Sequence, residues 1–313
     1  MNQENKNFIG IDVSKSTLDI SFGGKYLKIN NIAKDISNFI ETEICLANDF
    51  PKLVCLESTG GYEKTAMQAF WNASIPIHRA HPNRVHSFAR AAGHFAKTDK
   101  LDSKLLEKYA AFVFDQEKGD SALSQPTVEL QELHNVESNL MDNLHASKCR
   151  LQHINGSGSK YLLKQIEFIK EQISLVRIEI DELINSNDDL RGKREILTSY
   201  KGVGKQVSSA LLAGLPELGS LNKKEVASIV GVSPKLQHSG LKNPNGHISG
   251  GRFYIRKVLY MSALVAIRHN ERMKNFYHRL ISAGKAKKVA ITAVMRKVIV
   301  CLNAMLKNNA FYV

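Results

Sequence analysis

Four carboxylates are placed where they could serve one catalytic pocket. Asp12 and Glu57 each follow an apolar run that is typical of a strand, so each stands at a strand end. Asp99 and Asp102 lie three residues apart, about one turn of a helix. Carboxylate oxygens are the ligands that Mg²⁺ prefers. Together these acids predict a Mg²⁺ site that cuts a phosphodiester by two-metal catalysis.

Each acid taken alone also has a purely structural explanation. Asp12 could belong to a turn, and Glu57 could be a solvated strand end. Thr98 or Asp99 could be a helix N-cap, and Asp102 would then favour the positive end of that helix. The joint occurrence of the four acids in a basic chain is what favours the metal site.

The elements around these acids predict an α/β domain. Apolar patterns indicate, in order, strands at 8–12, 18–22 and 26–29, a helix over 32–44, a strand at 53–56, a helix over 62–71, a strand at 75–78, and helices over 82–92 and 101–114. A meander followed by alternating helices and strands is typical of a mixed sheet. This is the element order of ribonuclease-H-like (RuvC-like) nucleases.

Strand signals vanish from about 126 to 187. There, apolar residues alternate spacings of four and three, which predicts a coiled-coil seam of Leu162, Ile166, Ile169, Ile173, Val176, Ile180 and Leu183. The seam could pack within its own chain as a helical hairpin. A projecting hairpin needs something to cover its seam, which favours pairing between copies in a dimer or tetramer.

The C-terminal part of the sequence predicts an all-α domain with a helix-hairpin-helix. Lys201, Gly202, Gly204 and Lys205 belong to a glycine hairpin between two helices. Such hairpins offer backbone N–H groups to a phosphate, although a plain turn with glycine caps is the alternative. We therefore expect three domains: 1–122 catalytic, 123–190 coiled coil and 191–313 helical.

The charge of the chain indicates a polyanionic partner. The formal net charge is +13, and the stretch from His247 to the end holds 13 Lys or Arg against one acid, Glu271. A folded basic region of this kind favours nucleic acid over a membrane surface, without separating DNA from RNA.

The longest apolar run, 258–267, is too short to span a bilayer, and no membrane role is expected. Four scattered cysteines and a polar N-terminus predict a soluble cytoplasmic protein.

These motifs together resemble the insertion-sequence-110 family of bacterial transposases, which includes the Piv-type DNA invertases. The N-terminal matches are 10–15 (GIDVSK), 57–62 (ESTGGY) and 97–103 (KTDKLDS), the last with Ser103 where alanine is more usual. The C-terminal matches are 200–204 (YKGVG), with Lys201 in the usual place of proline, then 231–234 (GVSP), Ser239-Gly240, and 248–252 (ISGGR) with Arg256 and Leu259. The matches follow the family order from residue 8 to about 270.

The resemblance implies a mechanism for the expected activity. The four acids form a DEDD site that binds Mg²⁺, and a serine of the C-terminal domain, here Ser249, attacks DNA to form a phosphoserine link. The DNA partners are the element ends and the target. Many members are guided by a structured bridge RNA, and the protein would associate with the bacterial nucleoid.

Ser249 also suits this role on physical grounds. It precedes a helix whose positive end attracts a phosphate, and Arg252 and Arg256 fall on one helical face, where they could hold phosphate oxygens, with Lys257 beside them. The nearby His247 is a candidate proton shuttle. The competing explanation for the serine is a helix N-cap.

Three other functions remain compatible with the sequence. A site-specific DNA invertase of the same family would share every motif. A junction-resolving or RNA-cleaving nuclease would need only the DEDD site. A non-catalytic nucleic-acid-binding assembly protein would need none of the acids.

Overall fold

The computed structural model describes residues 7–93, 98–115, 124–154, 156–235 and 247–312. The chain divides into two compact units, 1–122 and 123–313, each with its own core. Part of the third acidic motif, Lys97, and the predicted Ser239-Gly240 block lie outside the described residues.

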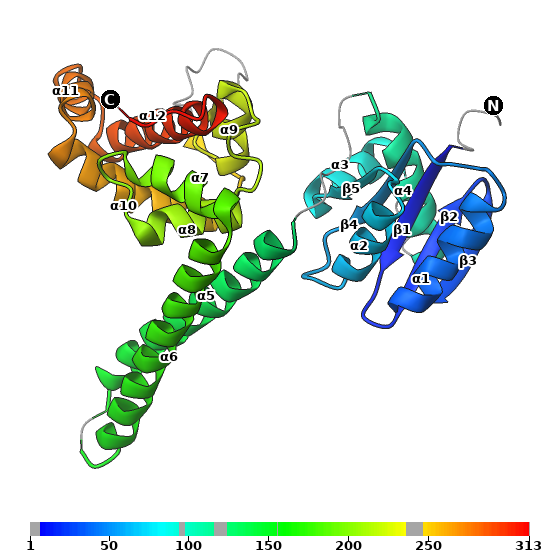
Figure 1. Cartoon of the computed structure of the whole chain (residues 1–313), viewed down its shortest axis with the longest axis horizontal. Helices are drawn as coiled ribbons and strands as arrows, with labels where there is room; N and C mark the ends of the chain where they lie inside the picture. Colours follow the sequence, from blue (N-terminus) through cyan, green and yellow to red (C-terminus); the bar gives the residue numbers. More distant parts are fainter. Residues whose placement is uncertain (1–6, 94–97, 116–123, 155, 236–246, 313) are drawn as a thin grey trace. The chain divides into compact units, whose positions relative to one another are not determined.

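The N-terminal unit contains a five-stranded mixed sheet of order β3-β2-β1-β4-β5 (Figure 1). Its strands are β1 (Phe8–Val13), β2 (Thr17–Phe22), β3 (Lys25–Asn30), β4 (Leu53–Glu57) and β5 (Ile77–Ala80). The meander β1-β2-β3 is antiparallel, whereas β4 and β5 run parallel to β1. The predicted mixed α/β sheet is confirmed. The last strand begins two residues later than expected, after a turn in which Ser74 has a positive φ.

Strict alternation along the strands gives the two faces of the sheet different characters. The side chains of Ile9, Ile11 and Val13 belong to the core beneath the helices α1 (Ala33–Phe39) and α2 (Lys64–Asn72). Figure 1 shows these two helices over that face, with the π-helix η1 (Ile40–Cys45) continuing α1. Because alternate residues point oppositely, Gly10 and Asp12 face the other side of the sheet.

That second face is covered by α4 (Asp99–Val113), with α3 (Pro82–Ala91) packed beside it. Gly10 makes the close approach of α4 possible. A Cβ built on Gly10 would lie 2.1 Å from the carbonyl oxygen of Ser103 and 2.1 Å from the amide nitrogen of Glu107. The absence of a side chain at residue 10 thus lets the second turn of α4, which follows Asp99 and Asp102, pack directly against the middle of β1.

The C-terminal unit is helical apart from a two-stranded pair, β6 (Pro234–Lys235) and β7 (His247–Ile248). Its helices are α5 (Gln125–Leu151), α6 (Ser159–Ser186), α7 (Asp188–Thr198), α8 (Lys205–Gly214), α9 (Lys223–Val230), α10 (Phe253–His269), α11 (Glu271–Ser282) and α12 (Lys287–Lys307). The hydrophobic core of this unit contains apolar residues of α7 to α12, together with Leu130 from the start of α5 and Ile180 and Ile184 from the end of α6.

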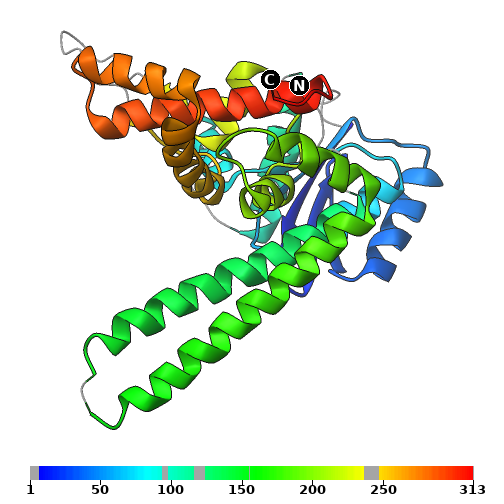
Figure 2. The same ribbon diagram turned by 60° about the vertical axis from the view of Figure 1, so that its left-hand side comes forward.

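Helices α5 and α6 form a long antiparallel pair that extends from the helical core (Figures 1 and 2). The predicted seam of α6 is covered by α5 within the same chain, since Ile166, Ile169 and Ile173 share a buried cluster with Leu144. The premise that this seam is left for another copy is therefore wrong. An antiparallel partner helix satisfies a heptad pattern as well as a second chain does.

Helix α12 has the length and composition of a membrane span, with a mean hydropathy of 1.8 over its most apolar window, half of which is buried. Val294, Val298 and Leu302 lie on its buried face within the helical core. This helix differs from 258–267, the longest apolar run of the sequence. Because α12 packs as a core helix, its apolar composition is explained without a bilayer.

Candidate active site: an acidic cleft and a serine turn

The acidic cleft starts from a row of polar side chains that crosses the sheet. Strand register places Asp12 opposite Asp19, and Asp19 opposite Lys28. Glu57 stands one residue beyond the last paired position of β4 with β1, next to Asp12. Directly opposed residues on neighbouring strands project from the same face. The sheet therefore carries Glu57, Asp12, Asp19 and Lys28 on the face beneath α4.

Helix α4 contributes the other two predicted acids. Thr98 is its N-cap and accepts a hydrogen bond from the Leu101 amide at 3.3 Å, so Asp99 is not the cap. The helix begins two residues before the predicted start, which places Asp99 and Asp102 in its first turn. There the positive helix end favours carboxylates.

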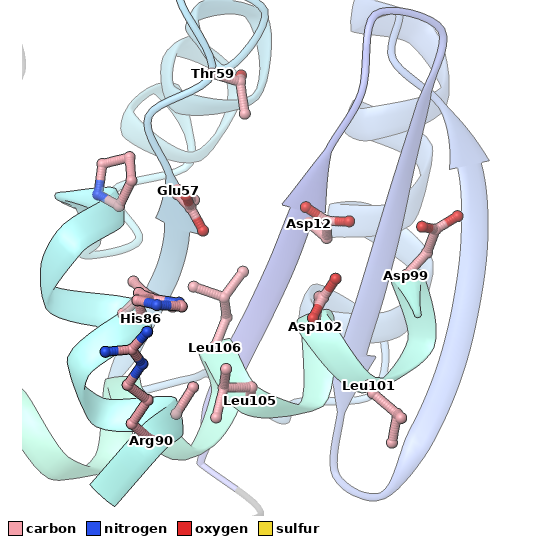
Figure 3. A pocket seen from close by; sticks show the side chains of 13 residues that line it. Asp12, Glu57, Thr59, His86, Arg90, Asp99, Leu101, Asp102, Leu105 and Leu106 are labelled. Atoms are coloured by element: carbon pink, nitrogen blue, oxygen red, sulfur yellow. The ribbon is translucent and has the colours of Figure 1, made fainter. Parts of the chain in front are cut away.

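The four predicted acids line one cleft of about 690 Å³ (Figure 3). Asp12 and Asp102 face each other across it, Glu57 approaches from β4, and Asp99 lies toward the outer strands. Sequence reasoning missed the opposite wall, where His86 and Arg90 of α3 line the same cleft. Their spacing of four residues on one helix is the signal that would have indicated them.

Crowded negative charge marks the cleft as a place for a cation. Burial and the nearby Asp102, Asp99, Asp19 and Glu57 raise the pKa of Asp12 from 3.8 to about 6. Neighbouring carboxylates have this effect because each disfavours ionisation of the next. A bound divalent ion would relieve the repulsion.

The donor set therefore fits a hard divalent ion in its chemistry. In the described parts of the chain, no group of three or more His, Cys, Asp or Glu is close enough to hold an ion as the side chains stand. To hold one ion, the acids would have to move closer together by side-chain rotation. The backbone already directs all four toward one cleft.

A buried glutamate fixes the loop that follows Glu57. Glu63 is 2% exposed and accepts hydrogen bonds from the amides of Gly61 at 2.8 Å and Thr59 at 3.2 Å, and from the Thr59 hydroxyl. Burial alone would raise the pKa of Glu63, but these hydrogen bonds outweigh it and the pKa is lowered. Glu63 thus holds the loop of the second motif beside the acidic cleft.

In the C-terminal unit, Ser249 lies on a turn that is locked by close backbone contact. Gly231, the C-cap of α9 with φ of 75°, lies against this turn, and a Cβ there would come within 2.2 Å of the Gly250 carbonyl oxygen. The Arg252 amide donates to the carbonyl of Ile229 at 2.8 Å. Arg252, not Ser249, occupies the N-cap position of α10, so the alternative explanation of the serine as an N-cap is wrong.

The two arginines after the serine are engaged within the chain. Arg252 forms a two-pronged ion pair with Glu217, at 2.6 and 2.7 Å, and donates to the Gly214 carbonyl. Arg256 donates to the carbonyls of Gly250 at 2.5 Å and Gly231 at 3.3 Å. In this structure both guanidinium groups therefore position the serine turn. The predicted contacts of these arginines with phosphate would need guanidinium N–H groups that these interactions do not use. Lys257 is exposed.

The predicted helix-hairpin-helix is formed by α7, a turn and α8. Gly202 has φ of 116°, and a Cβ there would lie 2.9 Å from the Ser262 carbonyl of α10, so this glycine permits tight packing. Gly204 is the N-cap of α8 and provides no side-chain cap, while Lys201 and Lys205 are exposed on either side. This helix end retains the geometry expected of a phosphate site.

Carboxylates from β1, β4 and a crossing helix, on a five-stranded mixed sheet, define the ribonuclease-H-like class of metal-dependent nucleases. Two family models match the chain: "Transposase" of the DEDD IS110 type over residues 9–154, and "Transposase IS116/IS110/IS902 family" over residues 194–278. The chain belongs to the IS110/IS116/IS902 family of transposases. It is thus an enzyme of DNA strand cleavage and transfer, it acts on DNA, and its DEDD domain implies a divalent metal.

The relatives include gene-inverting proteins and an uncharacterized protein of an insertion element. The pilin gene-inverting proteins of Moraxella bovis and Moraxella lacunata are 26% and 27% identical over 318 residues, covering 97% of this chain and 97% of each relative. A protein of insertion element IS110 from Streptomyces coelicolor is 25% identical over 153 residues, covering 48% of this chain and 37% of the relative.

Proposed function

We propose that this enzyme cuts and exchanges the DNA strands of an insertion sequence through a phosphoserine intermediate. The observation that carries the proposal is the convergence of Asp12, Glu57, Asp99 and Asp102 on one cleft. Mg²⁺ held by these acids would stabilise the charge that develops on the scissile phosphate. His86 and Arg90, on the opposite wall, are suited to hold the flanking backbone.

The covalent step in this proposal uses the Ser249 hydroxyl. Its oxygen forms a bond to phosphorus while the bond from phosphorus to a deoxyribose oxygen breaks, and the hydroxyl proton ends on the released sugar oxygen. The locked turn supports the assignment because a positioned nucleophile loses little entropy on reaction. Arg252 and Arg256 contribute by holding that turn.

The Ser249→Ala variant tests this proposal. We expect it to give no covalent protein–DNA adduct above background, while DNA binding in a filter or gel-shift assay stays within about twofold because no phosphate contact is removed. The adduct is trapped with denaturant and mapped by mass spectrometry. Ser233→Ala, in another motif of the same unit, is the matched control and should form adduct normally.

An adduct of normal yield in Ser249→Ala would favour a nuclease that uses only the acidic site.

The same assay separates the two family functions when it is run with and without the noncoding RNA of the element. Adduct that depends on RNA supports a bridge-RNA-guided transposase. RNA-independent adduct supports the second candidate, a site-specific invertase, which the full-length similarity to the pilin gene-inverting proteins favours.

We also propose a homo-oligomer formed through α6, by a surface other than its buried seam. Tyr161, Phe168 and Leu175 repeat every seven residues and are 69%, 60% and 53% exposed, with Ile178 one turn further on. A heptad stripe left uncovered by α5 suits a second copy of this helix pair.

The variant Phe168→Glu/Leu175→Glu should therefore reduce the mass in light scattering to the 34.9 kDa of one chain. In such an interface, the introduced glutamates of the two copies would lose their hydration without gaining an opposite charge. Lys170→Glu, which changes an exposed position on the same helix away from the stripe, should keep the wild-type mass. A wild-type protein that is itself monomeric would rule the interface out.

A further inference from the structure

Lys28 occupies a position between two acids of the cleft. Its Nζ lies 3.2 Å from Oδ2 of the buried Asp19 and 3.8 Å from Oδ2 of Asp99. Both contacts follow from the fold: register pairs Lys28 with Asp19, and the close docking of α4 brings Asp99 over β3. An ammonium group thus stands beside one of the four carboxylates proposed to bind the ion.

The two carboxylates that contact Lys28 differ in mobility. The Asp19 side chain is 3% exposed, and its second oxygen accepts a hydrogen bond from the Tyr26 hydroxyl, so this acid is fixed. The Asp99 side chain is 68% exposed and sits on the first residue of α4. Because it is largely exposed, the Asp99 side chain has room to change rotamer, and Lys28 attracts it toward β3.

The ammonium group of Lys28 is able to move away from Asp19 and Asp99. Its side chain is 48% exposed, so it can extend into solvent without opening the core. The β3 backbone would stay in place because it is paired with β2 along its whole length, from Lys25 to Asn30. A DNA phosphate at the cleft would offer Lys28 an alternative anionic partner.

We propose that Lys28 is a resident counter-cation that holds Asp99 away from the metal site until DNA draws the lysine to a phosphate. This inference rests on the proposed function of the four acids. In the DNA-free protein, Lys28 opposes divalent ions in two ways: its charge repels them, and it retains one of their ligands. Lys28 is thus a positioning residue for Asp99, and the substrate completes the site.

The test measures metal binding without DNA and without turnover, by Mn²⁺ electron paramagnetic resonance titration. Lys28→Gln should bind Mn²⁺ about tenfold more tightly than the wild type, the effect of removing one positive charge about 6 Å from a divalent ion in water. Lys25→Gln is the matched control. It removes a charge from the same strand, where the lysine pairs with Glu43, and should leave the affinity within about twofold.

Two further variants separate the possible failures. Asp102→Asn should weaken Mn²⁺ binding, and if neither the wild type nor Lys28→Gln shows binding that Asp102→Asn reduces, the proposed function of the acids fails. If binding depends on Asp102 but Lys28→Gln is no tighter than Lys25→Gln, or is weaker, this inference alone is overturned. Because Lys28→Gln leaves Asp19 without its ion pair, the comparison is repeated in an Asp19→Asn background, where the same tightening is expected.

Discussion

Replacing Asp12 by Asn should reduce Mg²⁺-dependent strand cleavage by about 10³-fold or more while making the folded protein more stable at neutral pH. Cleavage is lost because Asp12 is the central acid of the cleft. The ion that it would hold stabilises the transition state by several kcal/mol, and about 1.4 kcal/mol corresponds to a factor of ten in rate. The gain in stability follows because Asn removes a carboxylate that its neighbours repel.

The sign of this stability effect depends on pH in a defined way. The pKa of Asp12 is raised from 3.8 to about 6 in the folded protein. Between these values the folded state binds more protons than the unfolded state, so stability falls as pH rises through that window. The difference between Asp12→Asn and the wild type should therefore be small below pH 4, grow from pH 4 to 6, and stay constant above it.

Thermal unfolding monitored by circular dichroism at pH 3.5, 5 and 7.5, without divalent ions, measures this profile. Asp49→Asn, an exposed acid of the same unit outside the cleft, is the control and should leave both cleavage and the pH profile unchanged. A cleavage rate for Asp12→Asn near that of the wild type would remove the acid from the active site. Added Mg²⁺ should abolish the stability advantage of the variant, because only the wild type gains from binding.

The positions of Asp12, Glu57 and the α4 acids could be predicted because each depends on local pattern. An apolar run that stops at an acid marks a strand end, and Thr98 with two following acids marks a helix start. These signals need no knowledge of which strands are neighbours. They placed all four acids that the cleft brings together.

Asp19 and Lys28 could not be predicted in the same way, because their importance comes from strand register. Asp19 alternates with buried Leu18 and Ile20, which suggests a solvent-facing residue on an edge of the sheet. Only the pairing of β2 with both β1 and β3, and the covering of that face by α4, makes Asp19 a buried neighbour of Asp12. Long-range pairing is not encoded in the spacing of one strand.

The arginines beside Ser249 show a related limit. Their spacing of four residues correctly predicts one helix face, but not the partner of that face. Glu217 and the Gly231 carbonyl come from distant segments that tertiary packing brings to α10. Similarly, the heptad pattern of α6 correctly predicted a partner helix, but such a pattern does not show which chain supplies that helix. Here α5 of the same chain supplies it.

Replacing Gly10 by Ala should destabilise the N-terminal unit by about 1–3 kcal/mol and lower cleavage more than the stability loss explains. A methyl group at residue 10 would lie 2.1 Å from backbone atoms of α4, which cannot rotate away, so the helix must shift outward. A shift of α4 moves Asp99 and Asp102 together away from Asp12. Misplacement by about 1 Å is enough to cost about 10²-fold in rate.

The two effects of Gly10→Ala are measured separately. Denaturant unfolding gives the stability loss, and cleavage at a temperature where the variant is still fully folded gives the rate. Gly192→Ala is the control: this glycine lies inside α7, an added Cβ meets no atom within 4 Å among the described residues, and alanine there should stabilise the helix by about 0.5–1 kcal/mol. If Gly10→Ala cleaves DNA normally when folded, the close docking of α4 serves stability alone, and the acids do not depend on it for their alignment.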